Sequence, residues 1–293
     1  ITAALGLIVV AMLIKMALFP LHVWLPDAHS YAPSVVAAIL ASIQIEVPAY
    51  VLVRLFLYVF PPEYLAYPSL TTIICWVSAV GIIFGSVMAI AQRDFKRLLA
   101  YSTVSQVAYI GLGIGLANPL GLIGALLHIL NHAFMKSCLF LVAGGVRNQT
   151  GLREIRWFAG LGRRLPITMA AFTVAALSMV GIPPTAGFFS KWYLIRGSID
   201  SGNWVFVGVI LASSLLTAVY FFRMIEKIYA HAPVEIEGED AETRPRKVSP
   251  ARILIPILIL AAGILVLGSI NAFIVSQILN KAVAPLYSIV GGG

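Results

Sequence analysis

The chain has 293 residues, of which 60% are apolar and only 11% carry a charge, and its mean hydropathy is +0.95. A soluble domain carries roughly 25% charged residues, so this composition excludes an ordinary soluble domain. Backbone polar groups cannot stay unpaired in hydrocarbon, and the apolar runs reach about 20 residues, which is the length of a membrane-crossing helix. The sequence therefore predicts an all-α integral membrane protein.

Polar residues and prolines divide the chain into apolar segments that predict a bundle of about eight transmembrane helices. In chain order these segments cover residues 1–29, 33–60, 70–91, 98–116, 120–146, 165–195, 205–229 and 253–270. Residues 271–290 either extend the last helix or lie at the membrane interface. The two longest connections, 147–164 and 231–250, are predicted to be solvated loops.

The placement of basic residues predicts the orientation of the bundle. With eight spans, the connections after the first, third, fifth and seventh segments share one side of the membrane, and this side carries thirteen basic residues: Arg93, Lys96, Arg97, Arg147, Arg153, Arg156, Arg163, Arg164, Lys227, Arg244, Arg246, Lys247 and Arg252. The opposite side carries Arg54, Arg196 and Lys281. By the positive-inside rule the thirteen-residue side is cytoplasmic, and both ends of this chain lie outside. The net charge of +8 is thus explained by topology and does not require nucleic acid as a partner.

Cofactor chemistry has no ligand set in this sequence. Cys75 and Cys138 both lie in apolar stretches without metal-ligand spacing, so we expect them to be buried small side chains. The residues predict no iron–sulfur cluster, haem, zinc site or other cofactor, and no catalytic site. Because the chain opens at Ile1 inside an apolar run, we expect it to be a piece of a longer protein or half of a split one.

Apart from residues nearer the helix ends, such as Arg54 and Arg223, four charged residues remain inside predicted spans: Lys15, Glu46, Lys136 and Lys191. A charge at the centre of a membrane helix costs roughly 2.5–3.5 kcal/mol, so such residues usually face one another, a hydrated cavity or an ion path.

Two of these lysines lie beside proline breaks, Lys15 near Pro20 and Lys191 near Pro183 and Pro184. Proline removes a backbone donor and interrupts the helix. Interrupted helices at corresponding positions in two halves are typical of transporters built from inverted repeats, which have their ion site near the break.

The fifth segment carries His128, His132 and Lys136 at steps of four residues. This spacing puts all three on one helix face about 12 Å long. Histidine titrates near neutral pH, so the stripe is a candidate proton relay along the membrane plane. The alternative is that each histidine is a hydrogen-bonded packing residue.

Four stretches of the sequence carry a family resemblance: residues 15–29 (KMALFPLHVWLPDAH), 94–113 (DFKRLLAYSTVSQVAYIGLG), 128–141 (HILNHAFMKSCLFL) and 181–194 (GIPPTAGFFSKWYL). They resemble the landmark motifs of the antiporter-like subunits of respiratory complex I, membrane-bound hydrogenases and related archaeal complexes, and Mrp-type sodium/proton antiporters. The resemblance implies part of an inverted-repeat fold with two broken helices. Residues 1–60 would be the end of the first repeat, 61–230 the second repeat, and 231–293 a cytoplasmic loop, the final helix and the tail.

The resemblance also implies roles for individual residues. Lys15 matches the central lysine of the first broken helix, and Lys191 matches the residue of the second broken helix near the exit path. His128, His132 and Lys136 match the helix that connects the two half channels. Many relatives carry a lysine where this chain has Glu46. We therefore expect either that Glu46 is an acidic partner of Lys15 or that the first half channel is altered or inactive.

The function that these features favour is proton translocation by one subunit of a multisubunit complex. The partners implied are antiporter-like neighbours and a redox module, which would make the chain a subunit of a redox-driven oxidoreductase. Two alternatives remain: sodium/proton exchange in an Mrp-type module, for which Glu46 is the available carboxylate, and a structural subunit that no longer transports ions.

Overall fold

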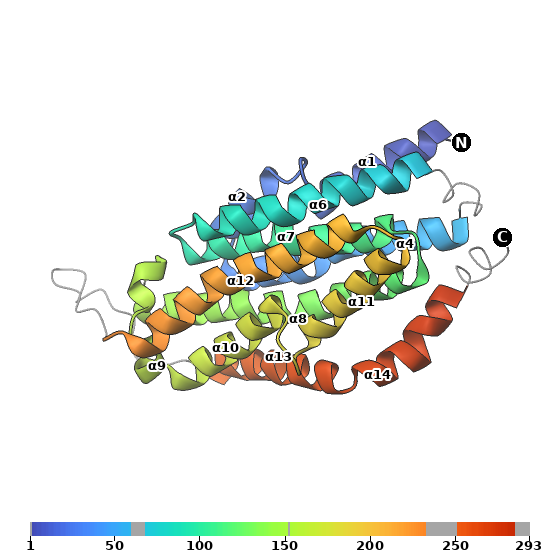
Figure 1. Cartoon of the computed structure of the whole chain (residues 1–293). Coiled ribbons are helices and arrows are strands. Elements are labelled where there is room, and N and C mark those ends of the chain that lie inside the picture. Colours follow the sequence, from blue (N-terminus) through green and yellow to red (C-terminus); the bar gives the residue numbers. More distant parts are fainter. Residues whose placement is uncertain (1, 60–67, 152, 233–250, 285–293) are drawn as a thin grey trace.

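The computed structural model describes residues 2–59, 68–151, 153–232 and 251–284 (Figure 1). Within these ranges the elements are helical, and no strand is present beyond an isolated bridge between Asp94 and Glu154. The first part contains α1 (Thr2–Met16), α2 (Trp24–Tyr31), α3 (Ser34–Ile39), η1 (Leu40–Gln44), α4 (Glu46–Arg54) and η2 (Leu55–Val59). The second and third ranges contain α6 (Pro68–Ile90), α7 (Phe95–Gly115), α8 (Pro119–Thr150), η3 (Ile155–Phe158), α9 (Leu161–Arg164), α10 (Pro166–Val180), α11 (Ala186–Asp200) and α12 (Trp204–Ala230). The last contains α13 (Ala251–Ser269), α14 (Asn271–Ile274) and η5 (Val275–Leu279).

Six of the described helical stretches are long and apolar enough to cross a membrane: Ser34–Arg54, Leu70–Ile90, Phe95–Gly115, Pro119–Thr150, Trp204–Ala230 and Ala251–Ser269. Two interrupted spans, α1–α2 and α10–α11, supply the remaining predicted segments. The predicted all-α membrane bundle with two broken helices is therefore confirmed. After a turn at Ile270 the chain is helical again as far as residue 284.

Both predicted breaks are present. The first separates Met16, the end of α1, from Trp24, the start of α2. The second separates Val180 from Ala186, and it begins at Gly181, whose φ of +93° lies in the left-handed region that favours glycine at helix ends. Pro183 and Pro184 follow, and because proline has no backbone N–H, the helix cannot continue through them.

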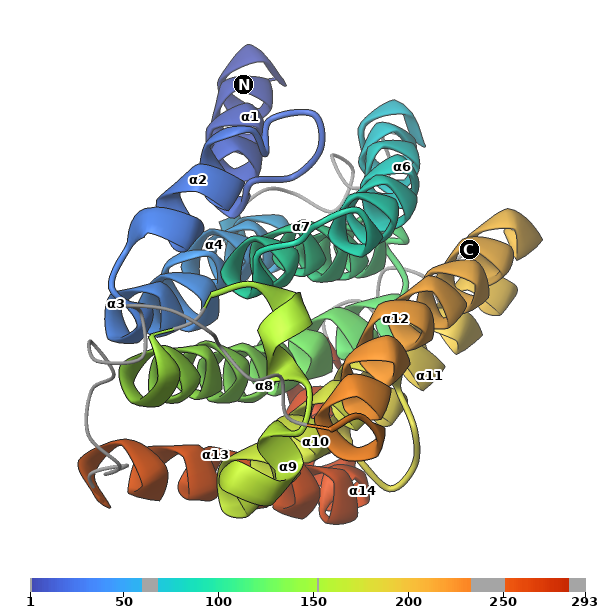
Figure 2. The ribbon, with the colours of Figure 1, turned by 90° about the vertical axis from the view of Figure 1, so that its left-hand side faces the viewer.

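Helix α8 lies at the centre of the bundle, where it contacts α3, α7, α10, α11 and α13 (Figure 2). Asn118 caps its start by accepting a hydrogen bond from the Gly121 N–H at 2.7 Å, and Gly151 ends it with a φ of +73°. The helix therefore continues past the predicted end at residue 146, and the prediction of a loop from Arg147 was wrong by one helical turn. A basic residue does not end a helix, whereas a glycine in the left-handed conformation does.

Candidate ion-translocation site

The polar stripe of α8 faces the interior of the bundle. His128, His132 and Lys136 are each 0% exposed, although they lie in the middle of an apolar helix. The rings of His128 and His132 are nearly parallel, with their centres 6.0 Å apart. The predicted common face of these three residues therefore exists, and what they contact determines what the face can do.

His132 is paired with Glu46, whose carboxylate Oε1 hydrogen-bonds to Nδ1 of the imidazole. Glu46 is the first residue of α4, and it is only 5% exposed. Since the described residues contain no ion pair between Glu46 and Lys15, the prediction that Glu46 is the partner of Lys15 was wrong. The register of α4 against α8 brings Glu46 to the histidine stripe instead.

His128 connects the stripe to α11. Its Nδ1 lies 2.9 Å from the hydroxyl of Ser190, the residue before Lys191. Its ring also packs against Tyr109 of α7 at a centroid distance of 5.5 Å, and the Lys191 ammonium lies 5.2 Å from the centre of the same tyrosine ring. An ammonium group over an aromatic face is attracted by the ring quadrupole. Tyr109 thus lies between His128 and Lys191.

Lys191 is held by the break in the second interrupted helix. Its ammonium donates to the carbonyl of Met179 at 2.8 Å and to that of Val180 at 3.0 Å. These carbonyls belong to the last residues of α10, where a helix leaves its acceptors unpaired and carries partial negative charge. A third hydrogen bond goes to the hydroxyl of Ser214 on α12 at 3.1 Å. The helix break thus creates the binding site for this buried ammonium.

Lys136, at the other end of the stripe, contacts α7. Its ammonium donates to the Leu99 carbonyl at 2.9 Å and to the hydroxyl of Ser102. The hydroxyl of Ser102 in turn donates to the same carbonyl at 2.9 Å. The partners of Lys136 are therefore neutral, as are those of Lys191.

Lys15 is not part of the row of buried side chains that Lys136, His132, His128 and Lys191 form. It lies in the last turn of α1 with an exposed side chain, and it makes no hydrogen bond or ion pair with the described residues. At the first break the carbonyl of Ile14 accepts from the backbone N–H of Ala17 and from the indole Nε1–H of Trp24, each at 3.0 Å, so the lysine is not needed there. The break at Pro20 therefore differs from the break at Pro183 and Pro184, where a lysine binds the helix end.

Sequence reasoning missed one buried lysine outside the site and several polar partners within it. Lys96 was placed on the basic loop side, yet it is 5% exposed and donates to the Ala32 carbonyl at 2.5 Å. Its position in the first turn of a strongly apolar helix was the available signal. Nothing in the sequence distinguishes the polar partners Ser102, Tyr109, Ser190 and Ser214 from other polar residues in helices.

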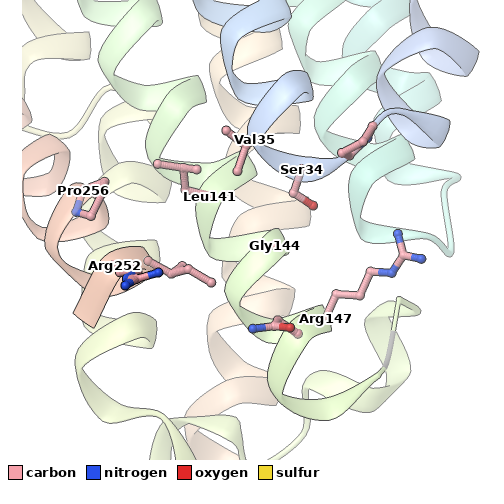
Figure 3. Close-up of a pocket in the computed structure, with 10 residues that line it drawn as sticks. Ser34, Val35, Leu141, Gly144, Arg147, Arg252 and Pro256 are labelled. Atoms are coloured by element: carbon pink, nitrogen blue, oxygen red, sulfur yellow. The ribbon is translucent and has the colours of Figure 1, made fainter. Parts of the chain in front are cut away.

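A cavity of about 610 Å³ lies away from the buried side chains described above (Figure 3). Its walls are mostly apolar and come from the start of α3, the C-terminal part of α8 and the start of α13. Arg147 and Arg252 line it, but their side chains extend in different directions (Figure 3). No group of three His, Cys, Asp or Glu side chains that could hold a metal ion occurs among the described residues.

Comparison with known sequences confirms the resemblance. Residues 1–217 match the family described as NADH:quinone oxidoreductase/Mrp antiporter, transmembrane. The chain is 50% identical to NADH-quinone oxidoreductase subunit N of Desulforudis audaxviator, over 95% of this chain and 57% of that protein. It is 35% identical to a subunit of the Na(+)/H(+) antiporter of Alkalihalophilus pseudofirmus, over 91% of this chain and 52% of that protein. The chain thus spans about half the length of these curated relatives.

Solved structures agree on the fold. A chain of the membrane-bound sulfane sulfur reductase, an archaeal respiratory membrane complex, superimposes with a TM-score of 0.83 at 28% identity, over 97% of this chain and 55% of that one. A chain of respiratory complex I from Thermus thermophilus gives a TM-score of 0.80 at 25% identity, over 97% and 58%. A chain of the Mrp complex from Dietzia sp. gives 0.86 at 22% identity, over 98% and 59%, which shows a shared fold. The chain belongs to the NADH:quinone oxidoreductase/Mrp antiporter transmembrane family.

Proposed function

We propose that the protein is a proton-translocating, antiporter-like membrane subunit of a multisubunit ion-pumping complex of the complex I or membrane-bound hydrogenase type. The observation that carries this proposal is the buried row from Lys136 through His132 and His128 to Lys191, whose side chains are 0–5% exposed. Each buried charge costs roughly 2.5–3.5 kcal/mol on insertion scales, and helix packing does not require any of them. Titratable side chains in one row across the bundle are the groups that proton transfer needs.

Several polar atoms of the side chains in and beside this row have no hydrogen-bond partner in the part of the chain that the structure describes. The Nε2 atoms of His128 and His132 and Oε2 of Glu46 are buried without a hydrogen-bond partner among the described residues. Buried polar atoms are normally satisfied by protein groups or by ordered water. We propose that water molecules at these atoms link Lys136, His132 and His128, so that protons pass along the row and leave near Lys191.

Partners and energy source are part of the same proposal. The relatives are subunits named for NADH-quinone oxidoreductase and for a Na(+)/H(+) antiporter, and the structural neighbours come from membrane complexes. We propose that this chain works beside other membrane subunits, including antiporter-like neighbours, and that a redox module drives it.

The remaining assignments rest on the resemblance. We propose that residues 1–60 end the first inverted repeat, that 61–230 form the second, and that 231–293 form the loop, last helix and tail. Lys15 would act in the first half channel, beside the break at Pro20.

Sodium/proton exchange is a second candidate function. The observation that favours it is Glu46, a buried carboxylate with one oxygen, Oε2, that has no hydrogen-bond partner among the described residues. Hard cations such as Na⁺ prefer carboxylate oxygen ligands. A requirement for Na⁺ in the flux measurement below would favour exchange, and proton flux without Na⁺ would favour the pump.

The test is proton flux in proteoliposomes that contain the intact complex, with Lys191→Ala compared with the wild type. We expect flux to fall by at least about tenfold while the complex stays assembled, since general acid–base groups contribute 10²–10⁴-fold to proton transfer. Lys281→Ala removes an exposed lysine and is the matched control. Unchanged flux in Lys191→Ala would contradict transport through this chain and would favour the structural-subunit alternative.

A further inference from the structure

A second cavity, of about 310 Å³, opens at the end of the bundle where α12 ends. Its rim carries polar and charged side chains from several segments, among them Gln92, Arg223, Glu226, Lys227 and His231. Arg223, Glu226 and His231 are exposed, whereas Tyr220, which also lines the cavity, is only 3% exposed. The cavity therefore leads from a charged rim to a buried tyrosine.

From this tyrosine a line of hydroxyl groups continues along α12 into the membrane interior. Ser213, Thr217 and Tyr220 lie on one helix face and are all buried. Ser213 already hydrogen-bonds to Ser86 at 2.7 Å, but the hydroxyls of Thr217 and Tyr220 have no hydrogen-bond partner among the described residues. An unpaired buried hydroxyl costs about 1–3 kcal/mol, so two of them together need a reason.

The tyrosine hydroxyl faces the row. It lies next to the hydroxyls of Thr217 and Ser102 without meeting the geometry of a hydrogen bond to either. Ser102 is the direct partner of the Lys136 ammonium. A small shift of the tyrosine side chain would therefore join the cavity to Lys136 through two hydroxyls.

We propose that this cavity is the mouth through which protons reach the row and that the Tyr220 hydroxyl relays them to Ser102 and Lys136. The inference rests on the proposed transport function and adds to it a route of entry. It predicts that protons enter at the end of the bundle that carries the α6–α7 turn, η3 and the C-terminal end of α12, which is the basic side (Figure 1).

Each proton transfer in this route is balanced. A hydronium at the cavity gives a proton to the Tyr220 oxygen and becomes water, while Tyr220 releases its own hydroxyl proton to the Ser102 oxygen. Ser102 passes its proton to the neutral amine of Lys136, which becomes an ammonium. Both hydroxyls end as they began, so each can act again once it has rotated. The proton on Lys136 then continues to the histidines.

The first experiment is Tyr220→Phe in the intact complex, with proton flux measured in proteoliposomes. This change removes one hydroxyl and keeps the ring that packs against Phe221, so the fold should be kept. We expect flux to fall about tenfold, because the chain of hydroxyls between the cavity and Ser102 loses one link. Tyr229→Phe is the matched control, because Tyr229 lies on the same helix with its hydroxyl 3.2 Å from Thr173, outside the cavity.

A double variant separates a relay from a packing effect. Ser102→Ala removes the hydroxyl that accepts the proton from Tyr220, so it interrupts the same transfer. The double variant of Tyr220→Phe and Ser102→Ala should therefore transport no more slowly than Ser102→Ala alone. Residues in one series of transfers are not additive, whereas independent packing defects add. Additive losses in the double variant would overturn the relay.

Blocking the mouth is an independent test. Arg223→Cys is labelled in the purified complex with a bulky, positively charged thiol reagent before reconstitution. Cys75 and Cys138 are buried and should not react. Flux should fall at least about tenfold on labelling and return on reduction, whereas labelled Val205→Cys, at the other end of α12, should transport normally.

The outcomes separate transport from the route of entry. If Lys191→Ala loses flux but Tyr220→Phe and labelled Arg223→Cys do not, transport stands and this entry route is refuted. If Lys191→Ala also keeps its flux, transport through the chain fails and the entry route fails with it.

Discussion

The pair between Glu46 and His132 allows a quantitative prediction. Glu46→Gln keeps the shape of the side chain and keeps one oxygen that accepts from the imidazole, but it cannot carry a negative charge when His132 is protonated. A buried hydrogen bond contributes about 1.5–3 kcal/mol when one group is charged and about 0.5–1.5 kcal/mol when both are neutral. The stabilisation of positive charge on His132 should therefore fall by about 1–1.5 kcal/mol. Because about 1.4 kcal/mol corresponds to a factor of ten, proton flux should fall about tenfold.

The assay is the initial rate of proton uptake into proteoliposomes, divided by the amount of assembled complex. Asp200→Asn is the matched control, because it removes an exposed carboxylate at the end of α11. Glu46→Ala goes further, since it leaves Nδ1 of His132 without its partner. That variant should also lose about 1–3 kcal/mol of stability, seen as a lower unfolding temperature. If Glu46→Gln transports at the wild-type rate, the carboxylate does not stabilise charge in transit, and the reasoning is refuted.

Two further predictions concern packing. Gly187→Ala should lower the unfolding temperature and the yield of assembled complex, because the new Cβ would lie 1.9 Å from the Ser178 carbonyl oxygen and overpacking costs about 1–3 kcal/mol or more. Gly208→Ala, which has nothing within 4 Å of the new Cβ, should leave both unchanged, and equal losses in the two variants would contradict the packing argument. Maleimide should label neither Cys75 nor Cys138 in the intact complex but both after denaturation, as read by mass spectrometry, since both thiols are buried.

The helices could be predicted because each depends on local sequence. Long apolar runs mark the spans, and the prolines at 183 and 184 mark the second break, whatever surrounds them. The common face of His128, His132 and Lys136 follows from helical geometry in the same way. The predicted end of α8 was wrong because a change in polarity was taken as the helix boundary, whereas the left-handed backbone conformation of Gly151 ends the helix.

The contacts of the site could not be predicted because they depend on how helices lie against one another. Glu46 and His132 are 86 residues apart, and only the register of α4 on α8 decides that they meet. Lys96 and Ala32 are 64 residues apart, and because they contact each other, Lys96 is buried although the sequence predicts it in a loop. Such contacts need the tertiary structure, because a change of one residue in register would point the side chain elsewhere.

The partners of the buried lysines explain how the row can carry charge without trapping it. Lys136 and Lys191 donate to carbonyls and hydroxyls, and no carboxylate contacts either among the residues that the structure describes. A neutral amine still has two N–H groups for carbonyls and a lone pair that can accept from a hydroxyl, so a lysine that loses its proton leaves no buried unpaired anion behind. A carboxylate partner would instead hold the proton on the lysine, because separating a buried ion pair is costly. The carboxylate of Glu46 is instead hydrogen-bonded to His132, which lies between the two lysines. There it can stabilise the imidazolium that forms while a proton passes along the row.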